Sequence, residues 1–404
     1  MSGTERLYFA DPWLHAFRGR VVAHAPWGTA GAPSVVLDRT AFYPEAGGQM
    51  ADRGALAGLA VIDVQVDDAG VIHHVVDPAA GPLPPIGAEI EGAVDPARRR
   101  VHMALHTGQH MLSRALADVA RANTVSSRLG ETVCTIDVDR DALDERLLAE
   151  SEDLTNAVID DDVPVRAFFP SPDELAALPL RRAPKVTENI RVVQVGDFDV
   201  SPCGGTHCTR SAQVGFVRIT GLERYKGKMR ISFAAGRRAR IELAGQADAL
   251  RELGRELTCG PLDVKGAVEK LRREGDMARE ALGRARIRLA DALAIELSAK
   301  AAADPRGLVI AVVDDASVEL LRAVAKQVTA HPGTVCLLAG VVEGGVAAMV
   351  SRAPGSSFDC GAFFKRAAAA AGGRGGGRPE HAEGRLPVGA DWTAIVTALL
   401  AAGG

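Results

Sequence analysis

Two short segments rich in metal-ligand residue types constrain how this chain can fold. Residues 106–110 read HTGQH and residues 203–207 read CGGTH, so each segment places two ligand side chains four positions apart. Four residues make about one helical turn, which puts His106 and His110 on the same face of a helix. Three imidazoles and a thiolate form a nitrogen and sulfur ligand set suited to zinc. We therefore expect the fold to bring the two segments together around Zn²⁺, with four ligands: His106, His110, Cys203 and His207.

The histidine pair alone is weak support for a metal, because two histidines one turn apart are more commonly a satisfied pair on a helix surface. The second segment is what favours the metal site. Thr107 follows His106, and no glutamate lies between the two histidines. This departs from the H-E-x-x-H motif of zinc proteases, so a protease is not indicated.

Length and composition indicate a globular multidomain protein. The 404 residues can form about two to four domains, and a hydrophobic fraction of 47% is ordinary for such proteins. The six cysteines are scattered, unlike a secreted disulfide framework. No apolar run approaches the ~20 residues of a membrane helix, and the N-terminus lacks the layout of a signal peptide. These features predict a cytoplasmic protein without membrane contact.

Basic residues gather in three runs, although the formal net charge is −4. The runs lie at Arg98–Arg100, between Arg218 and Arg240, and from Lys365 to Arg378. Each run alone is more commonly a solvated surface. Their positions beside the ligand segments and near the C-terminal end favour salt-sensitive contact with nucleic-acid phosphates.

Local patterns predict the secondary structure. Short apolar stretches between Gly, Pro and Asp predict a β-rich region up to about residue 95. Asp95 as N-cap and Pro96 in the first turn predict a helix over 96–120. Further elements are expected as strands over 124–138, a helix over 143–159, a strand over 192–195 and two heptad-patterned helices between 243 and 289. Apolar strands alternating with a helix predict an α/β layer after about residue 300.

The tract 367–377, rich in Ala and Gly, allows two interpretations. It is either a flexible low-complexity loop or a glycine-rich loop that approaches a phosphate backbone. The sequence alone leaves both open.

Four segments resemble, in order along the chain, the motifs of the alanyl-tRNA editing family. That family comprises the editing domain of alanyl-tRNA synthetase and the free-standing AlaX proteins. The four segments are the glycine-rich stretch 40–49 (TAFYPEAGGQ), the two ligand segments, and 375–379 (GGGRP). The last resembles the DHH-associated domain of the synthetase and of the long AlaX form. Ala46 stands where the family pattern leads us to expect glycine, which disfavours a positive φ there.

The resemblance implies an α+β multidomain fold. A β-barrel-like domain with the glycine-rich motif is expected over residues 1–95, a zinc-dependent α/β editing domain over 96–240, a helical hairpin over 241–300, and a C-terminal α/β DHH-associated domain over 301–404. The chain begins almost at the glycine-rich domain, so we do not expect an aminoacylation core. A homodimer through the hairpin or the C-terminal domain is one interpretation of these last two regions.

The resemblance also implies an activity: ATP-independent hydrolysis of seryl- or glycyl-tRNA made with alanine tRNA, for translation fidelity. The implied catalytic residues are the four ligands and Gln109, which lies between the two histidines. Implied substrate contacts are Thr124, Ser126, Ser127, Gly47, Gly48, Gln49 and Arg378. Zinc would polarise the ester carbonyl or acidify a bound water, and either role needs an open coordination position. If His207 lies outside the ligand shell that position exists, whereas four direct ligands close the shell.

Two other functions stay open. A threonine-specific tRNA is an alternative substrate, because threonyl-tRNA synthetase carries a similar editing domain, although segment 375–379 favours alanine. A zinc-stabilised tRNA-binding module without turnover would be indicated by buried ligands with no cleft beside them. A DHH-type phosphodiesterase is excluded, because the chain contains no Asp-His-His triplet.

Overall fold

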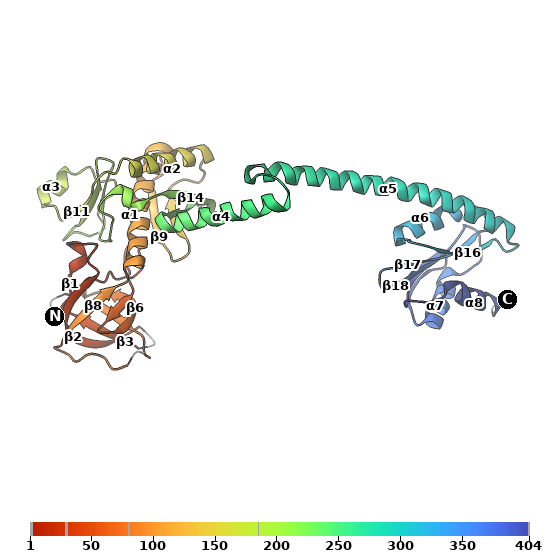
Figure 1. Cartoon of the computed structure of the whole chain (residues 1–404), viewed down its shortest axis with the longest axis horizontal. Helices are drawn as coiled ribbons and strands as arrows, with labels where there is room; N and C mark the ends of the chain where they lie inside the picture. Colours follow the sequence, from red (N-terminus) through yellow and green to blue (C-terminus); the bar gives the residue numbers. More distant parts are fainter. Residues whose placement is uncertain (1–2, 29–30, 80, 185, 403–404) are drawn as a thin grey trace. The chain divides into compact units, whose positions relative to one another are not determined.

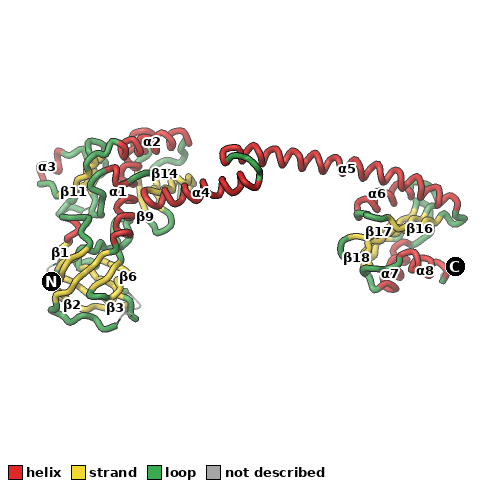
Figure 2. Tube along the Cα trace, viewed as in Figure 1, coloured by secondary structure: helices red, strands yellow, loops and turns green. Residues whose placement is uncertain are grey.

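The computed structural model describes residues 3–28, 31–79, 81–184 and 186–402. The chain forms two compact units, which meet in sequence between Glu252 and Leu253. Each unit combines helices with sheets (Figures 1 and 2), which confirms the predicted α+β class. Among the described helices, none has both the length and the apolar character needed to cross a bilayer. The finer division into four domains stays a prediction.

Six strands close into a barrel in the N-terminal part of the first unit. In barrel order they are β2 (Ala16–Trp27), β3 (Ala32–Leu37), β7 (Ile72–Val76), β6 (Leu59–Val66), β5 (Gly54–Leu56) and β8 (Glu89–Val94). Buried and exposed side chains alternate along β8, the two-residue period of a strand with one face on a core. Val35, Leu56 and Ile72 belong to the buried cluster that fills the barrel.

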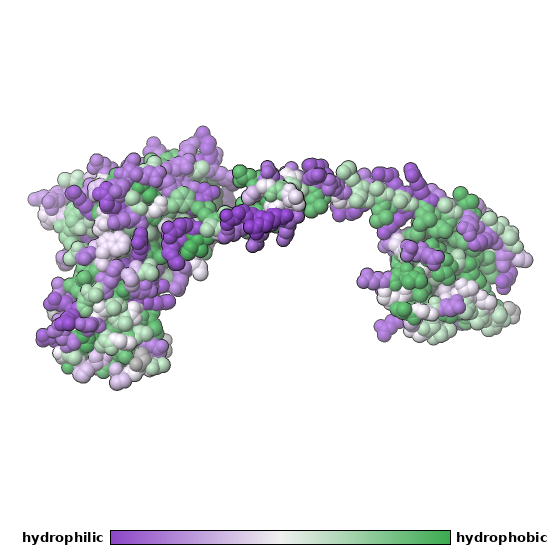
Figure 3. All heavy atoms as spheres, viewed as in Figure 1, coloured by the Kyte–Doolittle hydropathy of each residue, from purple (hydrophilic) through white to green (hydrophobic). Residues whose placement is uncertain are grey.

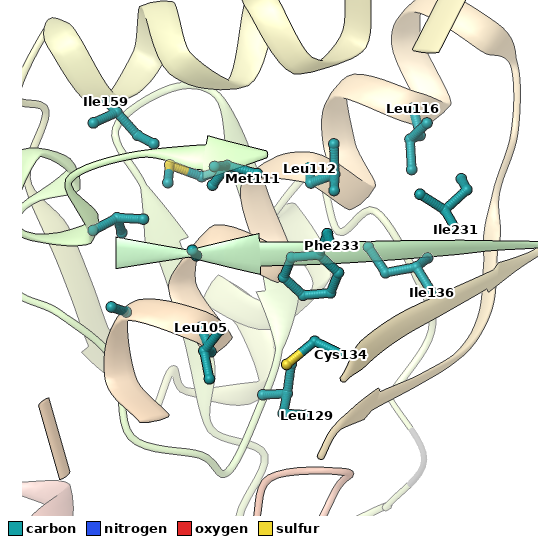
Figure 4. Close-up of a cluster of buried hydrophobic side chains, with 14 of the residues drawn as sticks. Leu105, Met111, Leu112, Leu116, Leu129, Cys134, Ile136, Ile159, Ile231 and Phe233 are labelled. Carbon is teal, nitrogen blue, oxygen red and sulfur yellow. The ribbon is translucent and has the colours of Figure 1, made fainter. Parts of the chain in front are cut away.

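A long helix, α1 (Pro96–Ala120), packs on a four-stranded sheet and carries the first ligand segment. The sheet order is β14 (Val217–Tyr225), β15 (Lys228–Ala235), β10 (Cys134–Val138) and β9 (Thr124–Leu129). The Asp95 side chain caps α1 by accepting a hydrogen bond from the Ala97 amide, as the sequence predicted. Figure 4 shows Leu112 and Leu116 of α1 in one buried cluster with Ile136, Ile231 and Phe233 of the sheet. This core fixes the helix face that presents the histidines.

The turn at the end of the glycine-rich segment joins the barrel region to this sheet. Ala46 and Gln49 form an isolated antiparallel bridge, and Gly47 and Gly48 between them have φ of +59° and +87°. Ala46 is not among the residues with positive φ, so alanine fits where the family pattern suggested glycine. The Gly48 carbonyl accepts a hydrogen bond from the Leu129 amide of β9 at 2.8 Å.

A small antiparallel sheet carries the second ligand segment. Its strands are β11 (Val165–Phe168), β12 (Val192–Val195) and β13 (Asp199–Pro202), and the loop after β13 begins at Cys203. The strand predicted over 192–195 is β12, with the same bounds. The remaining elements of this part are β1 (Glu5–Arg6), η1 (Leu7–Phe9), β4 (Arg39–Thr40), α2 (Glu145–Asp160), α3 (Pro172–Ala177) and η2 (Ser211–Val214).

A buried ion pair ties α1 to the barrel region. The side chains of Arg99 and Asp52 are both fully buried, and Arg99 Nε donates to Asp52 Oδ2 at 3.1 Å. Arg99 Nη1 also donates to the Pro12 carbonyl at 2.7 Å. Of the basic run Arg98–Arg100, Arg99 is therefore unavailable to a phosphate, whereas Arg100 is exposed.

Two long helices follow β15 along the chain. They are α4 (Gly236–Glu256) and α5 (Val264–Ala303), with a short turn η3 (Pro261–Asp263) between them. Charged residues give α4 the hydrophilic surface drawn purple in Figure 3. Leu250, Leu271 and Leu282, which belong to the predicted heptad seam, are exposed. The packing of the two helices as a hairpin stays a prediction.

The second unit contains a five-stranded sheet between two hydrophobic cores. The strand order is β16 (Leu308–Val313), β17 (Val335–Val342), β18 (Gly345–Arg352), β20 (His381–Leu386) and β19 (Arg374–Arg378), and only β16 and β17 are parallel. One core lies under the C-terminal turns of α5 and α6 (Val318–Val328), and the other lies under α7 (Cys360–Ala371) and α8 (Trp392–Ala401). The apolar strands predicted an α/β layer here, and the structure has helices on both faces of the sheet.

The tract 367–377 is not a flexible loop, so that interpretation of the sequence was wrong. Its first half ends α7 and its second half forms β19, which pairs with β20. A Cβ on Gly377 would lie 2.2 Å from the His381 carbonyl oxygen, and one on Gly375 would lie 2.5 Å from the Phe364 ring. The glycines therefore allow α7 and two strands to approach closely.

Candidate metal centre

The structure brings the four predicted ligand residues together in the first unit. One ligand atom from each of His106, His110, Cys203 and His207 lies within 4.8 Å of the others. Cys203 Sγ is 3.4 Å from His106 Nε2 and 3.3 Å from His207 Nε2. The three histidines are buried and Cys203 is half-buried. The cluster is therefore enclosed on most sides by protein.

Two different kinds of local structure hold the two segments. His106 and His110 occupy successive turns of α1, whereas Cys203 and His207 lie on the loop after β13. Gly205 lies against the His106 ring: a Cβ there would be 2.2 Å from His106 Cε1. Glycine at 205 thus lets the loop close over the histidine, while Gly204 has open space around it.

Each imidazole has a different oxygen near its Nδ1 atom. Gln49 Oε1 is 2.7 Å from His106 Nδ1. Asp199 Oδ2 is 3.4 Å from His110 Nδ1, and Thr107 Oγ1 is 3.2 Å from His207 Nδ1. A partner at Nδ1 holds the ring in place and leaves Nε2 free to bind a metal. This arrangement is typical of metal-binding histidines.

The distances from the Cys203 sulfur fit a tetrahedral zinc ion. Zinc with Zn–N near 2.0 Å and Zn–S near 2.3 Å requires ligand atoms roughly 3.3–3.7 Å apart, which includes the two distances from Cys203 Sγ. His110 Nε2 is buried and has no hydrogen-bond partner among the described residues, so an ion would satisfy it. The charges of His207 and His110 outweigh burial and hold the pKa of the Cys203 thiol well below its usual value. This favours the thiolate that binds metals.

The Asp199 carboxylate lies next to Nδ1 of His110. It is 1% exposed, and Arg181 Nε donates to its Oδ1 at 2.7 Å. Burial raises the pKa of Asp199, but the adjacent His110 ring and the charge of Arg181 outweigh it and lower the pKa to about 2. The carboxylate is therefore ionised at neutral pH and fixes the orientation of His110.

A cavity of about 1060 Å³ opens beside this cluster. His106 and Cys203 form part of its wall, and four of the predicted substrate contacts line it: Gly47, Gly48, Ser126 and Ser127. Aromatic and basic side chains complete much of the lining, including Tyr8, Phe169 and Arg191. The cavity is large enough for the end of a substrate much bigger than an amino acid.

Four other predicted site residues lie outside the cavity wall. Gln49 is fully buried, and its amide contacts His106 and Thr206, so it supports a ligand. Gln109 is 5% exposed and donates to Ser113 Oγ, as does the Thr124 hydroxyl. Arg378 lies on β19 in the second unit and is exposed.

Sequence reasoning missed two residues next to the centre. Asp199 was not considered, although an acidic residue in an apolar strand just before Cys203 is a usable signal. Arg191, which directly precedes β12, is 5% exposed and donates to the carbonyls of Cys203 and Gly205 at 3.1 and 2.7 Å. No motif marks it, because its role depends on a loop twelve residues further along the chain.

Comparisons with known proteins agree with this site. The family described as "Threonyl and Alanyl tRNA synthetase second additional domain" matches residues 190–232, which include the second ligand segment. The family described as "tRNA synthetases class II (A)" matches residues 21–98. The chain thus carries domains found in class II tRNA synthetases.

Two groups of relatives are more specific. The alanine–tRNA ligase of Archaeoglobus fulgidus is 31% identical over 401 residues, which cover 95% of this chain and 42% of the ligase. The alanyl-tRNA editing protein AlaX-L of Pyrococcus horikoshii is 32% identical over 241 residues, which cover 58% of this chain and 59% of that protein. A solved structure of the C-Ala domain from Aquifex aeolicus alanyl-tRNA synthetase matches 23% of this chain, with 19% identity and a TM-score of 0.22.

The chain is therefore a homologue of the alanyl-tRNA editing proteins and of the alanine–tRNA ligases. It spans less than half the length of that ligase and about three fifths of that editing protein.

Proposed function

We propose that this protein hydrolyses the ester between a wrong amino acid and alanine tRNA, with seryl- or glycyl-tRNA as substrate. The observation that carries the proposal is the cavity of about 1060 Å³ that reaches His106 and Cys203 of the metal centre. A zinc-stabilised binding module without turnover would need no such space beside its ligands. The likeness to an alanyl-tRNA editing protein supports the same reading.

The need for such an activity follows from the limits of binding. A pocket for alanine rejects serine poorly, because serine only adds a hydroxyl, and it cannot exclude the smaller glycine. A second site must then remove the errors and spare alanine. Hydrogen bonds to the serine hydroxyl supply this selectivity, because the correct alanyl ester leaves those groups unpaired.

Ser127 is the best candidate for reading the serine hydroxyl. It lines the cavity, and its hydroxyl makes no hydrogen bond with the described residues. The neighbouring Ser126 hydroxyl donates to Asp137, and that of Thr124 donates to Ser113. Of the three predicted hydroxyls, Ser127 therefore has the freest donor and acceptor capacity.

The reaction needs little from the protein beyond position. Water adds to the ester carbonyl carbon and the bond to the ribose oxygen breaks. That oxygen takes one proton of the water, the other proton passes to solvent, and the amino acid leaves as a carboxylate. Zn²⁺ at this centre would supply charge stabilisation at the carbonyl oxygen when one of its coordination positions is open to the ester. Gln49, Asp199 and Thr107 hold the histidine rings. Gly205 lies against the His106 ring and excludes bulk water from that side of it.

The proposal also includes a partner, a domain organisation, an oligomeric state and a location. The partner is tRNA, and exposed basic residues such as Arg100 are available for its phosphates, whereas Arg218 and Arg230 pair with Glu152 and Asp137. We further propose a four-domain organisation with bounds 1–95, 96–240, 241–300 and 301–404, a homodimer through the last two regions, and a cytoplasmic location.

The test is deacylation of seryl-, glycyl- and alanyl-tRNA that carry alanine identity. The protein is expected to remove serine or glycine and spare alanine, and Cys203→Ala should abolish the activity. Cys259→Ala, a half-buried cysteine outside the first unit, is the matched control and should keep it. If the folded, zinc-loaded protein hydrolyses none of the three esters, the proposal is wrong.

A further inference from the structure

Arg191 is a buried cation without a carboxylate partner among the described residues. It is 5% exposed, and its Nη1 atom makes both of its hydrogen bonds, to the carbonyls of Cys203 and Gly205. Its Nε atom is buried and unpaired, and no described residue bonds to Nη2. The Nε–Nη2 edge is the edge of a guanidinium that binds carboxylates and phosphates in a bidentate manner. Burying guanidinium donors without partners is costly, so this edge fits an anionic ligand.

Arg191 lies where two cavities meet. It lines the large cavity beside the metal centre and also a second cavity of about 540 Å³. Phe9 lines both as well, with the Arg191 guanidinium 4.9 Å above the centre of its ring. Phe9 and Arg191 therefore lie between the two cavities. His106 and Cys203 line the large cavity, and His207 lines the second one.

The second cavity has the electrostatic character of an anion site. Arg166 joins Arg191 in its wall, and the described lining residues include no aspartate or glutamate. Gln194 and Thr209 add polar groups. Two cations in a wall that, over the described residues, contains no acidic side chain favour a positive potential, which attracts a small anion.

We infer that the free edge of Arg191, a residue in the walls of both cavities, binds the anionic group of the substrate or product. The site itself stands on this geometry, and the choice of ligand rests on the proposed function. Two groups have the required chemistry: the carboxylate that the amino acid gains when its ester is cleaved, and a phosphodiester near the 3′ end of the tRNA. Both present two oxygens to a guanidinium edge.

Titrations of the zinc-loaded full chain, followed by ligand-observed NMR, test the site and identify the source. L-serine is compared with L-serinamide, which lacks the carboxylate, and adenosine 5′-monophosphate with adenosine. We expect one compound with the anionic group to bind at least about tenfold more tightly than its counterpart without that group. Preference for L-serine assigns the product carboxylate, and preference for the nucleotide assigns the phosphate.

Two variants locate the binding. Arg191→Met is expected to lower the affinity for the preferred anion by about tenfold or more, and Arg166→Met is expected to lower it by a smaller factor. Because Arg191 also holds the Cys203 loop, bound zinc is measured in each variant, and Arg166→Met leaves that loop untouched. If neither anion is preferred, or both variants bind like the unchanged protein while retaining zinc, the inference is overturned. If the unchanged, zinc-loaded protein binds the anion but hydrolyses none of the three esters, that result would instead contradict the proposed function.

Discussion

Gln49 and His106 are 57 positions apart in sequence, yet the Gln49 side-chain oxygen lies 2.7 Å from the His106 ring nitrogen Nδ1. The same oxygen accepts a hydrogen bond from the Thr206 amide at 3.1 Å. One glutamine from the glycine-rich turn thus contacts both ligand segments. The glycine-rich motif therefore supports the metal centre as well as forming part of the cavity wall.

Gln49→Leu is expected to lower zinc affinity by about ten- to hundredfold, because removal of an outer partner frees the ligand ring. Competition with a chromophoric chelator measures this without any substrate. Gln65→Leu is the control, since Gln65 donates to Asp63 within β6. Equal zinc affinity in the Gln49 and Gln65 variants would show that Gln49 does not orient His106.

Gly205→Ala is expected to disrupt the metal centre, because its Cβ would lie 2.2 Å from His106 Cε1 and 2.8 Å from Gln49 Oε1. Overpacking of this kind costs about 1–3 kcal/mol. Gly204→Ala is the matched control, with no atom within 4 Å of its Cβ. Zinc content after purification and the cobalt absorption spectrum report the difference. A Gly205→Ala protein with normal zinc content would contradict the close packing of the loop on His106.

Ser127→Ala is expected to reduce the hydrolysis of seryl-tRNA about tenfold and leave that of glycyl-tRNA unchanged. The reason is that only serine offers a hydroxyl to Ser127, whereas glycine makes no side-chain hydrogen bond there that the substitution could remove. The ratio of kcat/KM for the two esters is the measurement. Ser126→Ala is the control, because the Ser126 hydroxyl is already bonded to Asp137. A change of equal size for both esters would exclude Ser127 as the selective residue.

Arg99→Leu is expected to destabilise the first unit by about 3–5 kcal/mol, because it leaves the fully buried carboxylate of Asp52 without its partner. Arg100→Leu, at the exposed neighbour, should change the unfolding free energy by about 0.5 kcal/mol or less. Urea unfolding followed by tryptophan fluorescence compares the two. Similar unfolding midpoints for both variants would show that the Arg99 pair does not hold α1 to the barrel region.

His74 is expected to make stability depend on pH. Burial lowers its pKa to about 4, and the neutral ring contacts Val35 O through Nδ1 and Thr40 Oγ1 through Nε2. Because the folded state resists protonation, the contribution of His74 is complete above the unfolded pKa of about 6.5 and is lost as pH falls toward 4. The full loss is about 3 kcal/mol.

The measurement is the unfolding free energy of the unchanged protein and of His74→Gln between pH 7 and pH 4. The variant should lose less stability than the unchanged protein across this window. His24→Gln, at an exposed position on β2, should follow the unchanged protein. Parallel curves for His74→Gln and the unchanged protein would contradict a buried neutral His74.

Local signals made α1 and the four ligands predictable from the sequence. The Asp95 cap, Pro96 and the one-turn spacing of the histidines all act within a few residues, and the structure has the helix and the ligand cluster where they indicate. The apolar strands of the second unit are predictable for the same reason. Such features depend on short-range periodicity, which a single sequence displays directly.

Features that depend on distant partners were not predictable. The sequence predicted Gln49 as a substrate contact, whereas the fold places it against His106. Arg99 looks like one of three surface arginines in the sequence, whereas the fold places Asp52 beside it. The tract 367–377 resembles a flexible linker by composition. Only the close approach of α7 and β20 shows why its glycines are needed in an ordered strand.

The bond between the Gly48 carbonyl and the Leu129 amide has a consequence for how such proteins can arise by recombination. A gene segment that encodes only residues 96–252 would transmit all four ligands, together with α1 and both sheets that hold them. It would not transmit Gln49, which contacts His106, or Gly48 and the part of the cavity wall that it forms. One gene segment can therefore transfer all the ligand motifs, whereas the complete site is transferred only together with the barrel region that precedes them.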